Sequence, residues 1–156
     1  MAMIQLALHC LTESKCCSME EADRIGKLLV AGITSPRLSQ TPPDTQTATE
    51  CWASSEGERG LRSVSPWRYR LDWEPNRYPE YLLQAYCSCS HCVSLSKQSN
   101  SPRIYTRLEV KGNSVPIEFH TLVFYRKSCS ADGYYLEPKS IPVNVSCACL
   151  AARHDR

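Results

Sequence analysis

Large apolar side chains alternate with polar ones along several stretches in the second half of the chain. In the segment 67–73, Trp67, Tyr69 and Trp73 alternate with charged residues. Side chains two positions apart in a strand point to the same face, so this segment predicts a strand with one strongly aromatic face. The segment 141–149 shows the same alternation and places on its inner face Ile141, Val143, Val145, Cys147 and Cys149.

Turn signals divide the other predicted strands. The further segments that we interpret as extended are 81–89, 104–110 and 115–125. The segment 74–80 contains two prolines and predicts an irregular connection, while Lys111-Gly112-Asn113 and Asp132-Gly133 predict turns. We therefore expect a mostly β protein built from antiparallel strands.

The N-terminal part predicts one short helix followed by an arm. Ser18-Met-Glu-Glu21 matches a capping box, and apolar residues follow it at helical spacing, which predicts a helix over 19–31. Gly32 and Pro36 end this helix. The segment 34–60 is rich in Thr, Ser, Pro and Gly, which predicts a flexible arm. We expect the helix to pack through the stripe formed by Met19, Ala22, Ile25, Leu28 and Leu29.

Ten cysteines are many for a chain of 156 residues, and half of them cluster in two short segments. In extended strands, Cys87 and Cys89 share one face, as do Cys147 and Cys149, so two disulfides can join the two strands. A crosslink that closes a loop of about 60 residues typically contributes ~4 kcal/mol. The even number and the clustering favour a disulfide framework in an oxidising compartment.

A zinc site is the competing interpretation of the same cysteines. Cys89-x-x-Cys92 has the spacing of a ligand pair, and His91, or Cys147 together with Cys149, would complete the site. This alternative predicts an intracellular structural domain whose four zinc ligands are Cys89, Cys92, Cys147 and Cys149. It leaves the remaining cysteines without a role, and Cys-x-Cys is an uncommon ligand pair, so we favour disulfides and expect no metal.

Charge and hydropathy argue against two classes of partner. Lys and Arg number 18 and Asp and Glu 16, for a formal net charge of +2, whereas a nucleic-acid partner normally requires a strong basic stripe. No apolar run approaches the ~18 residues of a membrane span, so we expect no membrane insertion. The segment 1–17 starts with an apolar stretch that lacks a basic beginning, which we interpret as a weak or incomplete leader.

Motifs for catalysis are missing from the sequence. It contains no glycine-rich phosphate loop, no G-x-S-x-G elbow and no helix-borne histidine pair. His91 lies among cysteines, but a cysteine in a disulfide has no thiolate to offer. We therefore expect no enzyme, no catalytic residue and no cofactor. Asn144-Val-Ser146 is an N-glycosylation sequon, and strand parity turns Asn144 outward, where a glycan has room.

Four motifs follow one another in the second half of the chain. They are Leu61-Arg-Ser-Val-Ser-Pro-Trp67-Arg-Tyr-Arg70, Glu74-Pro-Asn-Arg-Tyr-Pro79 with the cysteine cluster behind it, Asn113-Ser-Val-Pro-Ile117, and Ile141-Pro-Val143 with Cys147-Ala-Cys149. In this order they resemble the interleukin-17 cytokine family, over Ser63 to Leu150. Cys129-Ser-Ala-Asp-Gly133 and Cys17-Ser-Met-Glu-Glu21 are most similar to the C subtype. The D subtype, which comes next, shares the first motif and the cysteine cluster.

The resemblance implies a cystine-knot-like disulfide framework. By position, it pairs Cys87 with Cys147 and Cys92 with Cys149. The family lacks the third bridge of true cystine-knot growth factors and has serines there. The residues that match those serines are Ser65 and Ser114.

The resemblance also suggests roles for other cysteines. Cys51 and Cys129 match a pair that links the N-terminal arm to the core or to the partner subunit. Cys89 is an extra cysteine of some subtypes, and Cys17 is its candidate partner. Two cysteines receive no assignment, namely Cys10 and Cys16.

In function, the resemblance implies a secreted homodimer that binds and pairs receptors of the interleukin-17 receptor family and triggers inflammatory or epithelial-defence signalling. An extracellular cystine-knot antagonist shares the fold and remains an alternative. Aromatic anchors dominate binding hot spots and loop residues are exposed, so the candidates for the dimer or receptor surface are Trp67, Tyr69, Trp73, Asn76, Arg77, Tyr78 and Pro79. For Trp67 and Tyr69, a place in the core is an equally good interpretation.

The chain departs from the family pattern in three places. The segment 94–111 is longer than usual, Ser146 replaces a glycine, and the leader is poor. We expect four parts: the leader 1–17, a helix and flexible arm over 18–62, the cytokine domain 63–150 and a tail 151–156.

Overall fold

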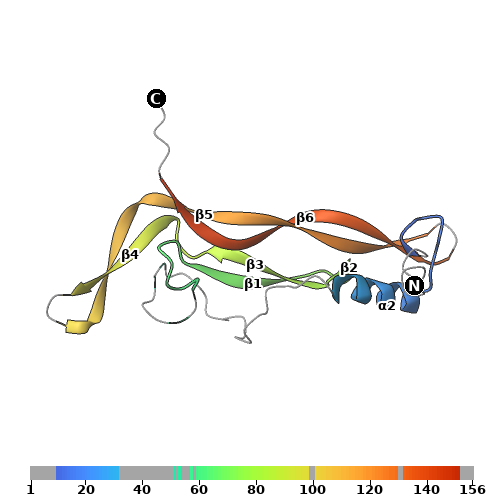
Figure 1. Cartoon of the computed structure of the whole chain (residues 1–156), viewed down its shortest axis with the longest axis horizontal. Helices are drawn as coiled ribbons and strands as arrows, with labels where there is room; N and C mark the ends of the chain where they lie inside the picture. The colour runs from blue at the N-terminus through green and yellow to red at the C-terminus, as the bar shows by residue number, and fades with distance from the viewer. Residues whose placement is uncertain are drawn as a thin grey trace, which may run out of the picture. The chain divides into compact units, whose positions relative to one another are not determined.

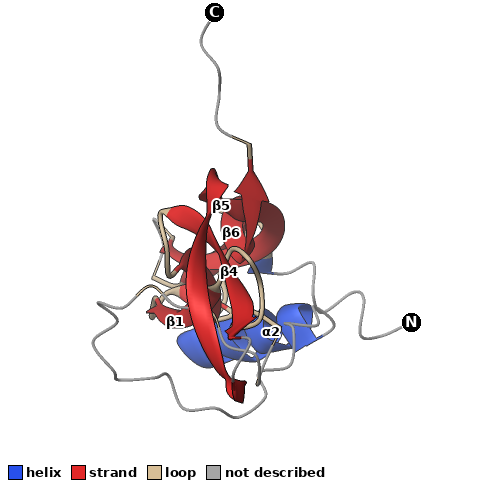
Figure 2. Cartoon of the chain, turned by 90° about the vertical axis from the view of Figure 1, so that its left-hand side faces the viewer, coloured by secondary structure: helices blue, strands red, loops and turns tan. Residues whose placement is uncertain are grey.

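The computed structural model describes residues 10–31, 51, 53, 57, 59–98, 101–129 and 132–151, with the side chains of these residues except 95–98 and 101–110. Strands dominate this part of the chain (Figures 1 and 2), and the recorded pairings are antiparallel. The mostly β, antiparallel fold predicted from the sequence is therefore confirmed. The elements are α2 (Met19–Ala31), β1 (Trp67–Trp73), β2 (Arg77–Tyr78), β3 (Tyr81–Cys87), β4 (His91–Gln98), β5 (Ser101–Ser128) and β6 (Tyr134–Leu150).

Helix α2 has the bounds that its sequence predicts. Ser18 is the N-cap, and its Oγ accepts a hydrogen bond from the backbone N–H of Glu21 at 3.2 Å. Glu20 and Glu21 place negative charge in the first turn, where the helix dipole favours it. Capping and apolar spacing act within a few residues, so the sequence alone identifies this element.

The buried face of α2 differs in part from the predicted stripe. Met19 and Leu28 are 45% and 58% exposed, whereas the buried residues of the helix are Ala22, Ile25 and Gly26. Gly26 lies against the ring of Tyr78: a Cβ at this glycine would be 2.6 Å from the Cγ of Tyr78. Apolar spacing misses this contact because glycine contributes no hydrophobic side chain to the pattern.

The strands form two sheets. β1 and β3 make a two-stranded sheet, while β5 pairs with β2, β4 and β6 in a four-stranded sheet. β2 lies inside the predicted irregular connection 74–80 and pairs Arg77 with Tyr125 and Tyr78 with Phe124. β3 ends at Cys87, so the extended segment predicted to reach Cys89 is two residues too long.

The turn predicted at 111–113 is wrong, because β5 continues through it. The partners jump from His91–Asn113 to Cys92–Val110, which is an irregularity in the β4–β5 ladder. Gly112 has φ +148° at this point, so the chain bends within the strand rather than reversing. The turn predicted at Asp132-Gly133 is consistent with the structure, since it separates β5 from β6.

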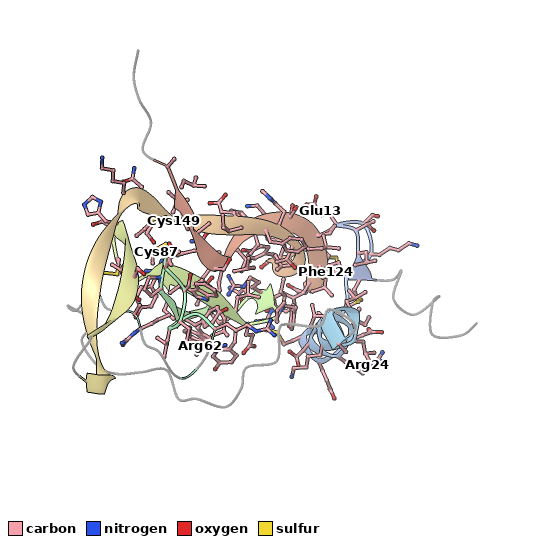
Figure 3. All side chains as sticks on the ribbon, turned by 60° about the vertical axis from the view of Figure 1, so that its left-hand side comes forward. Glu13, Arg24, Arg62, Cys87, Phe124 and Cys149 are labelled. Carbon is pink, nitrogen blue, oxygen red and sulfur yellow. A yellow bond between two sulfur atoms is a disulfide. The ribbon has the colours of Figure 1, made fainter. Side chains whose placement is uncertain are left out.

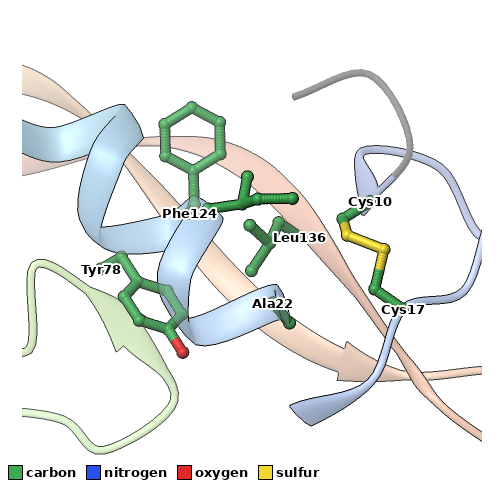
Figure 4. Close-up of a cluster of buried hydrophobic side chains, with 7 residues drawn as sticks. Cys10, Cys17, Ala22, Tyr78, Phe124 and Leu136 are labelled. Carbon is green, nitrogen blue, oxygen red and sulfur yellow. A yellow bond between two sulfur atoms is a disulfide. The ribbon is translucent and has the colours of Figure 1, made fainter. Parts of the chain in front are cut away.

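The chain divides into two compact units, each with its own buried cluster. Of the described residues, the first unit contains 10–31, 72–82, 120–129 and 132–142, and the second contains 51, 53, 57, 59–71, 83–98, 101–119 and 143–151. The cluster of the first unit consists of Cys10, Cys17, Ala22, Ile25, Tyr78, Phe124 and Leu136 (Figure 4). The second unit contains a cluster of Ala53, Cys89 and Val93, with Cys51 packed against it. Among the described residues, no helix combines the length and apolar character needed to cross a membrane.

Candidate functional site

Two disulfides attach β6 to its neighbours in the second unit. Cys87 at the end of β3 bonds Cys147, and Cys92 near the start of β4 bonds Cys149, both with a Cα–Cα distance of 5.7 Å. Cys92 and Cys147 are buried, and Figure 3 labels Cys87 and Cys149 in this framework. These are the two pairs that the resemblance implies. The alternation of side chains could not identify Cys92 as the partner of Cys149, because Cys92 lies in a different strand from Cys87.

The structure corrects the other expected cysteine pairs. Cys51 bonds Cys89 rather than Cys129, with a Cα–Cα distance of 4.8 Å. Cys129 bonds Cys16, at 6.1 Å. The expected partner of Cys89 was Cys17, which bonds Cys10. Cys17 packs in the cluster of the first unit and Cys89 in that of the second. Tertiary packing therefore decides these pairs.

The alternative zinc site is not assembled by this structure. All ten cysteines are in disulfides and none is free, so the four expected ligands have no thiolate for a metal. The ligand atoms of Cys10, Cys17 and Glu21 do lie within 4.8 Å of one another. Because these two cysteines are bonded to each other, this group is a disulfide beside a carboxylate.

The structure brings together the two serines that the resemblance matches to the missing third bridge. The hydroxyl of Ser65 is hydrogen-bonded to that of Ser114, and Ser65 is fully buried. The backbone N–H of Ser65 also donates to Ser63 Oγ at 3.0 Å. The hydrogen bond to the half-buried Ser114 thus satisfies the buried hydroxyl of Ser65.

Trp67 and Tyr69 contribute to the internal structure of the second unit. Trp67 Nε1 donates to the hydroxyl of Tyr69, which donates to the backbone carbonyl of Val145 in β6, each at 3.1 Å. One residue earlier in β6, the backbone N–H of Asn144 donates to Gln84 Oε1 at 2.9 Å. Side chains of β1 and β3 thereby satisfy backbone groups of β6, which favours the structural interpretation of both aromatic residues.

Large apolar side chains are exposed on β1 and on β5. Leu71 and Trp73 of β1 are 47% and 56% exposed, and Phe119 of β5 is 63% exposed. Trp73 therefore stays a candidate for a binding surface. Leu71 and Phe119 were not among the predicted surface residues. The signal for Phe119 is the alternation of Ile117 and Phe119 with charged and polar neighbours in a strand.

Arg77 was expected to be an exposed loop contact, and this is wrong. Its side chain is only 3% exposed. Nη1 donates to the carboxylates of Asp72 and Glu74 at 3.1 and 3.3 Å, and Nε donates to the carbonyl of Pro79 at 3.1 Å. Nη2 donates to the carbonyls of Asp72 and Glu80. A guanidinium has five donors in a fixed fork, and here they hold together the connection between β1 and β3.

Tyr78 is also buried rather than part of a surface. Its hydroxyl donates to Asp23 Oδ1 at 3.2 Å and accepts from Arg126 Nη1 at 2.9 Å. Burial raises the pKa of the Tyr78 hydroxyl above its usual value. A hydrogen bond from Lys27, at 2.7 Å, lowers the pKa of Asp23. These contacts fasten α2 to β2.

Three other predicted residues are partly or fully exposed. Asn76 is exposed, and its Oδ1 accepts a hydrogen bond from Arg126 Nη2 at 3.0 Å. Pro79 is half-buried. Asn144 of the sequon is half-buried in β6, so its glycosylation stays a prediction.

Comparison with known proteins gives matches within one family. The model of the family described as Interleukin-17 matches residues 63–151. Human interleukin-25 is 34% identical over 144 residues, which cover 88% of this chain and 77% of that protein. Human interleukin-17D is 34% identical over 91 residues, covering 58% of this chain and 41% of that protein. Mouse interleukin-17C is 33% identical over 106 residues, which cover 63% of this chain and 50% of that protein. The similarity to the C and D subtypes is nearly equal, so the predicted preference for C is not confirmed.

Proposed function

Because this chain belongs to the interleukin-17 family of cytokines, we propose that it is secreted and, as a homodimer, binds and pairs receptors of the interleukin-17 receptor family. The observation that supports this most directly is the family match over 63–151, which includes both disulfides of β6. A rigid dimer presents the same surface twice and brings two receptor chains together. The proposed result is inflammatory or epithelial-defence signalling.

The exposed tryptophan at the end of β1 supports a binding surface on the first unit. Trp73 is 56% exposed, and tryptophan is enriched among the hot spots of binding surfaces. We propose Trp73 as the anchor, either between subunits or against receptor. Arg77 and Tyr78 do not belong to this proposal, because both are buried and internal hydrogen bonds engage their side chains. Tyr69 is 37% exposed and Trp67 is half-buried, so a role of these two residues in binding stays a prediction.

Two measurements on the secreted protein test the proposal. Light scattering after size exclusion gives the oligomeric state, and surface plasmon resonance against a panel of interleukin-17 receptor ectodomains gives binding. We expect a dimer that binds at least one ectodomain. A monomer that binds none of them would contradict the proposed function.

A variant of Trp73 distinguishes a role in the dimer interface from a role in receptor binding. We expect Trp73→Ala either to shift the protein to monomer or to leave a dimer whose receptor affinity falls at least tenfold, since truncated hot spots cost about 2 kcal/mol or more. Leu28→Ala is the matched control, because Leu28 is exposed to the same degree but lies in α2. Unchanged assembly and affinity in Trp73→Ala would exclude Trp73 from the surface.

A cell reporter distinguishes a cytokine from an antagonist that shares the fold. Cells that carry the bound receptor chains should respond to the purified protein alone. A protein that binds without a response and blocks a known agonist would support the antagonist instead.

A further inference from the structure

The five disulfides differ in their access to solvent. Four of them contain at least one cysteine that is no more than 6% exposed. These buried cysteines are Cys10 and Cys17, which form one bridge, and Cys89, Cys92 and Cys147, which belong to the three others. The bridge between Cys16 and Cys129 contains none: Cys16 is exposed and Cys129 is half-buried. A reductant must reach a sulfur atom to attack it. Among the ten cysteines only Cys16 is exposed, since the most accessible cysteines of the other bridges are at best half-buried, so Cys16–Cys129 is the bridge most open to reduction.

This bridge fastens the segment before α2 to the turn between β5 and β6. Cys17, beside Cys16, exchanges two backbone hydrogen bonds with Tyr134, at 2.8 and 2.9 Å, and Cys129 donates from its N–H to the carbonyl of Gly133 at 2.9 Å. Ser18, the residue after Cys17, caps α2. The bridge thus joins the start of α2 covalently to the strands on which the helix packs.

Helix α2 covers an apolar surface of the first unit. Ala22 and Ile25 pack with Tyr78, Phe124 and Leu136, all of which are buried (Figure 4). The remaining ties of the helix to this surface are non-covalent. They include the hydrogen bond from the Tyr78 hydroxyl to Asp23.

We propose that Cys16–Cys129 is a redox-operated latch, which a dithiol reductant opens before any other bridge and whose opening loosens α2 from the surface of Tyr78, Phe124 and Leu136. The Cys10–Cys17 bridge stays closed, because both of its cysteines are buried. The device acts within the first unit and does not depend on receptor binding. It adds a means by which thiol conditions change the surface that the protein presents.

The opening reaction is a thiol–disulfide exchange. One thiolate of the reductant attacks Cys16 Sγ, the exposed sulfur, and forms a mixed disulfide while Cys129 leaves as a thiolate. The second thiolate attacks the mixed disulfide, releases Cys16 and closes the disulfide of the reductant. Two electrons pass to the protein, and the two protons of the reductant end on the thiols of Cys16 and Cys129.

Graded reduction tests the order of opening. The native protein is treated with rising dithiothreitol, trapped with N-ethylmaleimide, fully reduced, alkylated with iodoacetamide and mapped by peptide mass. We expect Cys16 and Cys129 to take the maleimide at roughly tenfold lower dithiothreitol than any other pair. Another pair that opens first, or five bridges that open together, would overturn the proposal.

Hydrogen exchange tests whether the bridge holds the helix. In Cys16→Ser/Cys129→Ser, we expect the amides of 19–31 to exchange roughly tenfold faster, the change that a loss of about 1.4 kcal/mol produces. Cys51→Ser/Cys89→Ser is the control, since it removes a bridge of the second unit and should leave these amides unchanged. Wild-type protein in which only Cys16–Cys129 has been reduced and alkylated gives the same measurement without mutation. If the amides of 19–31 exchange at the wild-type rate both in this alkylated protein and in Cys16→Ser/Cys129→Ser, the bridge is no latch.

Discussion

Arg77 illustrates how one buried charge depends on its neighbours. Removing a guanidinium from water is costly unless its donors are paired. The donors of Arg77 reach two carboxylates and several backbone carbonyls of the same connection. The side chains of Asp72 and Glu74 are 35% and 44% exposed. Water therefore screens part of each ion pair, and the hydrogen bonds to backbone carbonyls account for a larger share of the stabilisation of Arg77.

We expect Arg77→Ala to lower the free energy of unfolding by about 2 to 3 kcal/mol, below the full value for a buried pair because the carboxylates are partly solvated. Urea denaturation measures this. Arg70→Ala in β1 is the control, since Arg70 is exposed and such changes usually stay within about 0.5 kcal/mol. Equal losses in the two variants would mean that the buried network adds no stability.

Gly112 is a second residue whose surroundings restrict its side chain. A Cβ there would lie 2.9 Å from the Sγ of Cys92 and from the carbonyl oxygen of Leu150. Gly57 also has positive φ, at +97°, but its nearest neighbour to a Cβ would be at 3.6 Å. A side chain at either position would therefore strain the backbone, but only at Gly112 would it also collide with its neighbours.

We expect Gly112→Ala to lower the free energy of unfolding by roughly 2 kcal/mol more than Gly57→Ala does, because overpacking is added to strain. Denaturant curves of both variants give the difference, and peptide mass shows whether Cys92–Cys149 still forms. A loss in Gly112→Ala no larger than that in Gly57→Ala would show that the space around the disulfide can relax.

Among the secondary-structure elements, the docking of α2 on β2 links packing to pH. The pKa of Tyr78 is raised mainly by burial. Such a tyrosine stabilises the fold fully below its unfolded pKa of about 10, and this contribution is lost as the pH rises through the folded value. The pKa values of Tyr125 and Tyr135 are raised as well, so the wild type alone does not isolate Tyr78.

We expect the stability of Tyr78→Phe to fall less steeply above pH 10 than that of the wild type. Below pH 9 the variant should be less stable by about 1 kcal/mol, since the hydrogen bonds to Asp23 and Arg126 are lost. Denaturant titrations between pH 7 and pH 11 measure both effects. Parallel pH profiles would mean that Tyr78 titrates alike in the folded and unfolded chain.

In the molecule as a whole, the two disulfides of β6 close almost the same loop. Cys87–Cys147 spans 60 residues along the sequence and Cys92–Cys149 spans 57. In the chain-entropy description, whichever bridge forms first contributes about 4 kcal/mol, and the other closes only a short ring beside it and adds about 2 kcal/mol. Each bridge therefore largely substitutes for the other.

We expect Cys87→Ser/Cys147→Ser and Cys92→Ser/Cys149→Ser each to cost about 2 kcal/mol of unfolding free energy, and the combined variant to cost about 6 kcal/mol. Urea denaturation under non-reducing conditions completes this double-mutant cycle. If the combined cost equals the sum of the two separate costs, the bridges are independent and loop closure does not explain their stabilisation.

The sequence by itself determined the elements whose signals are local. Ser18 and the apolar spacing behind it specify α2 because capping and helix packing act within one or two turns. Alternation specifies β1, since strand geometry repeats every two residues. The family motifs likewise implied the pairs Cys87–Cys147 and Cys92–Cys149.

Only the tertiary structure decided which distant groups meet. Cys51 bonds Cys89, and Cys16 bonds Cys129, because packing brings those strands and loops together. Arg77 lies in a segment that resembles an exposed loop, yet it is buried because its donors find carboxylates and carbonyls across the connection. Gly112 matches a turn signal and lies within β5 because a long ladder with β4 and β6 outweighs the local preference. Such partners are many residues apart, so their energies depend on the folded chain and leave no pattern in short segments of sequence.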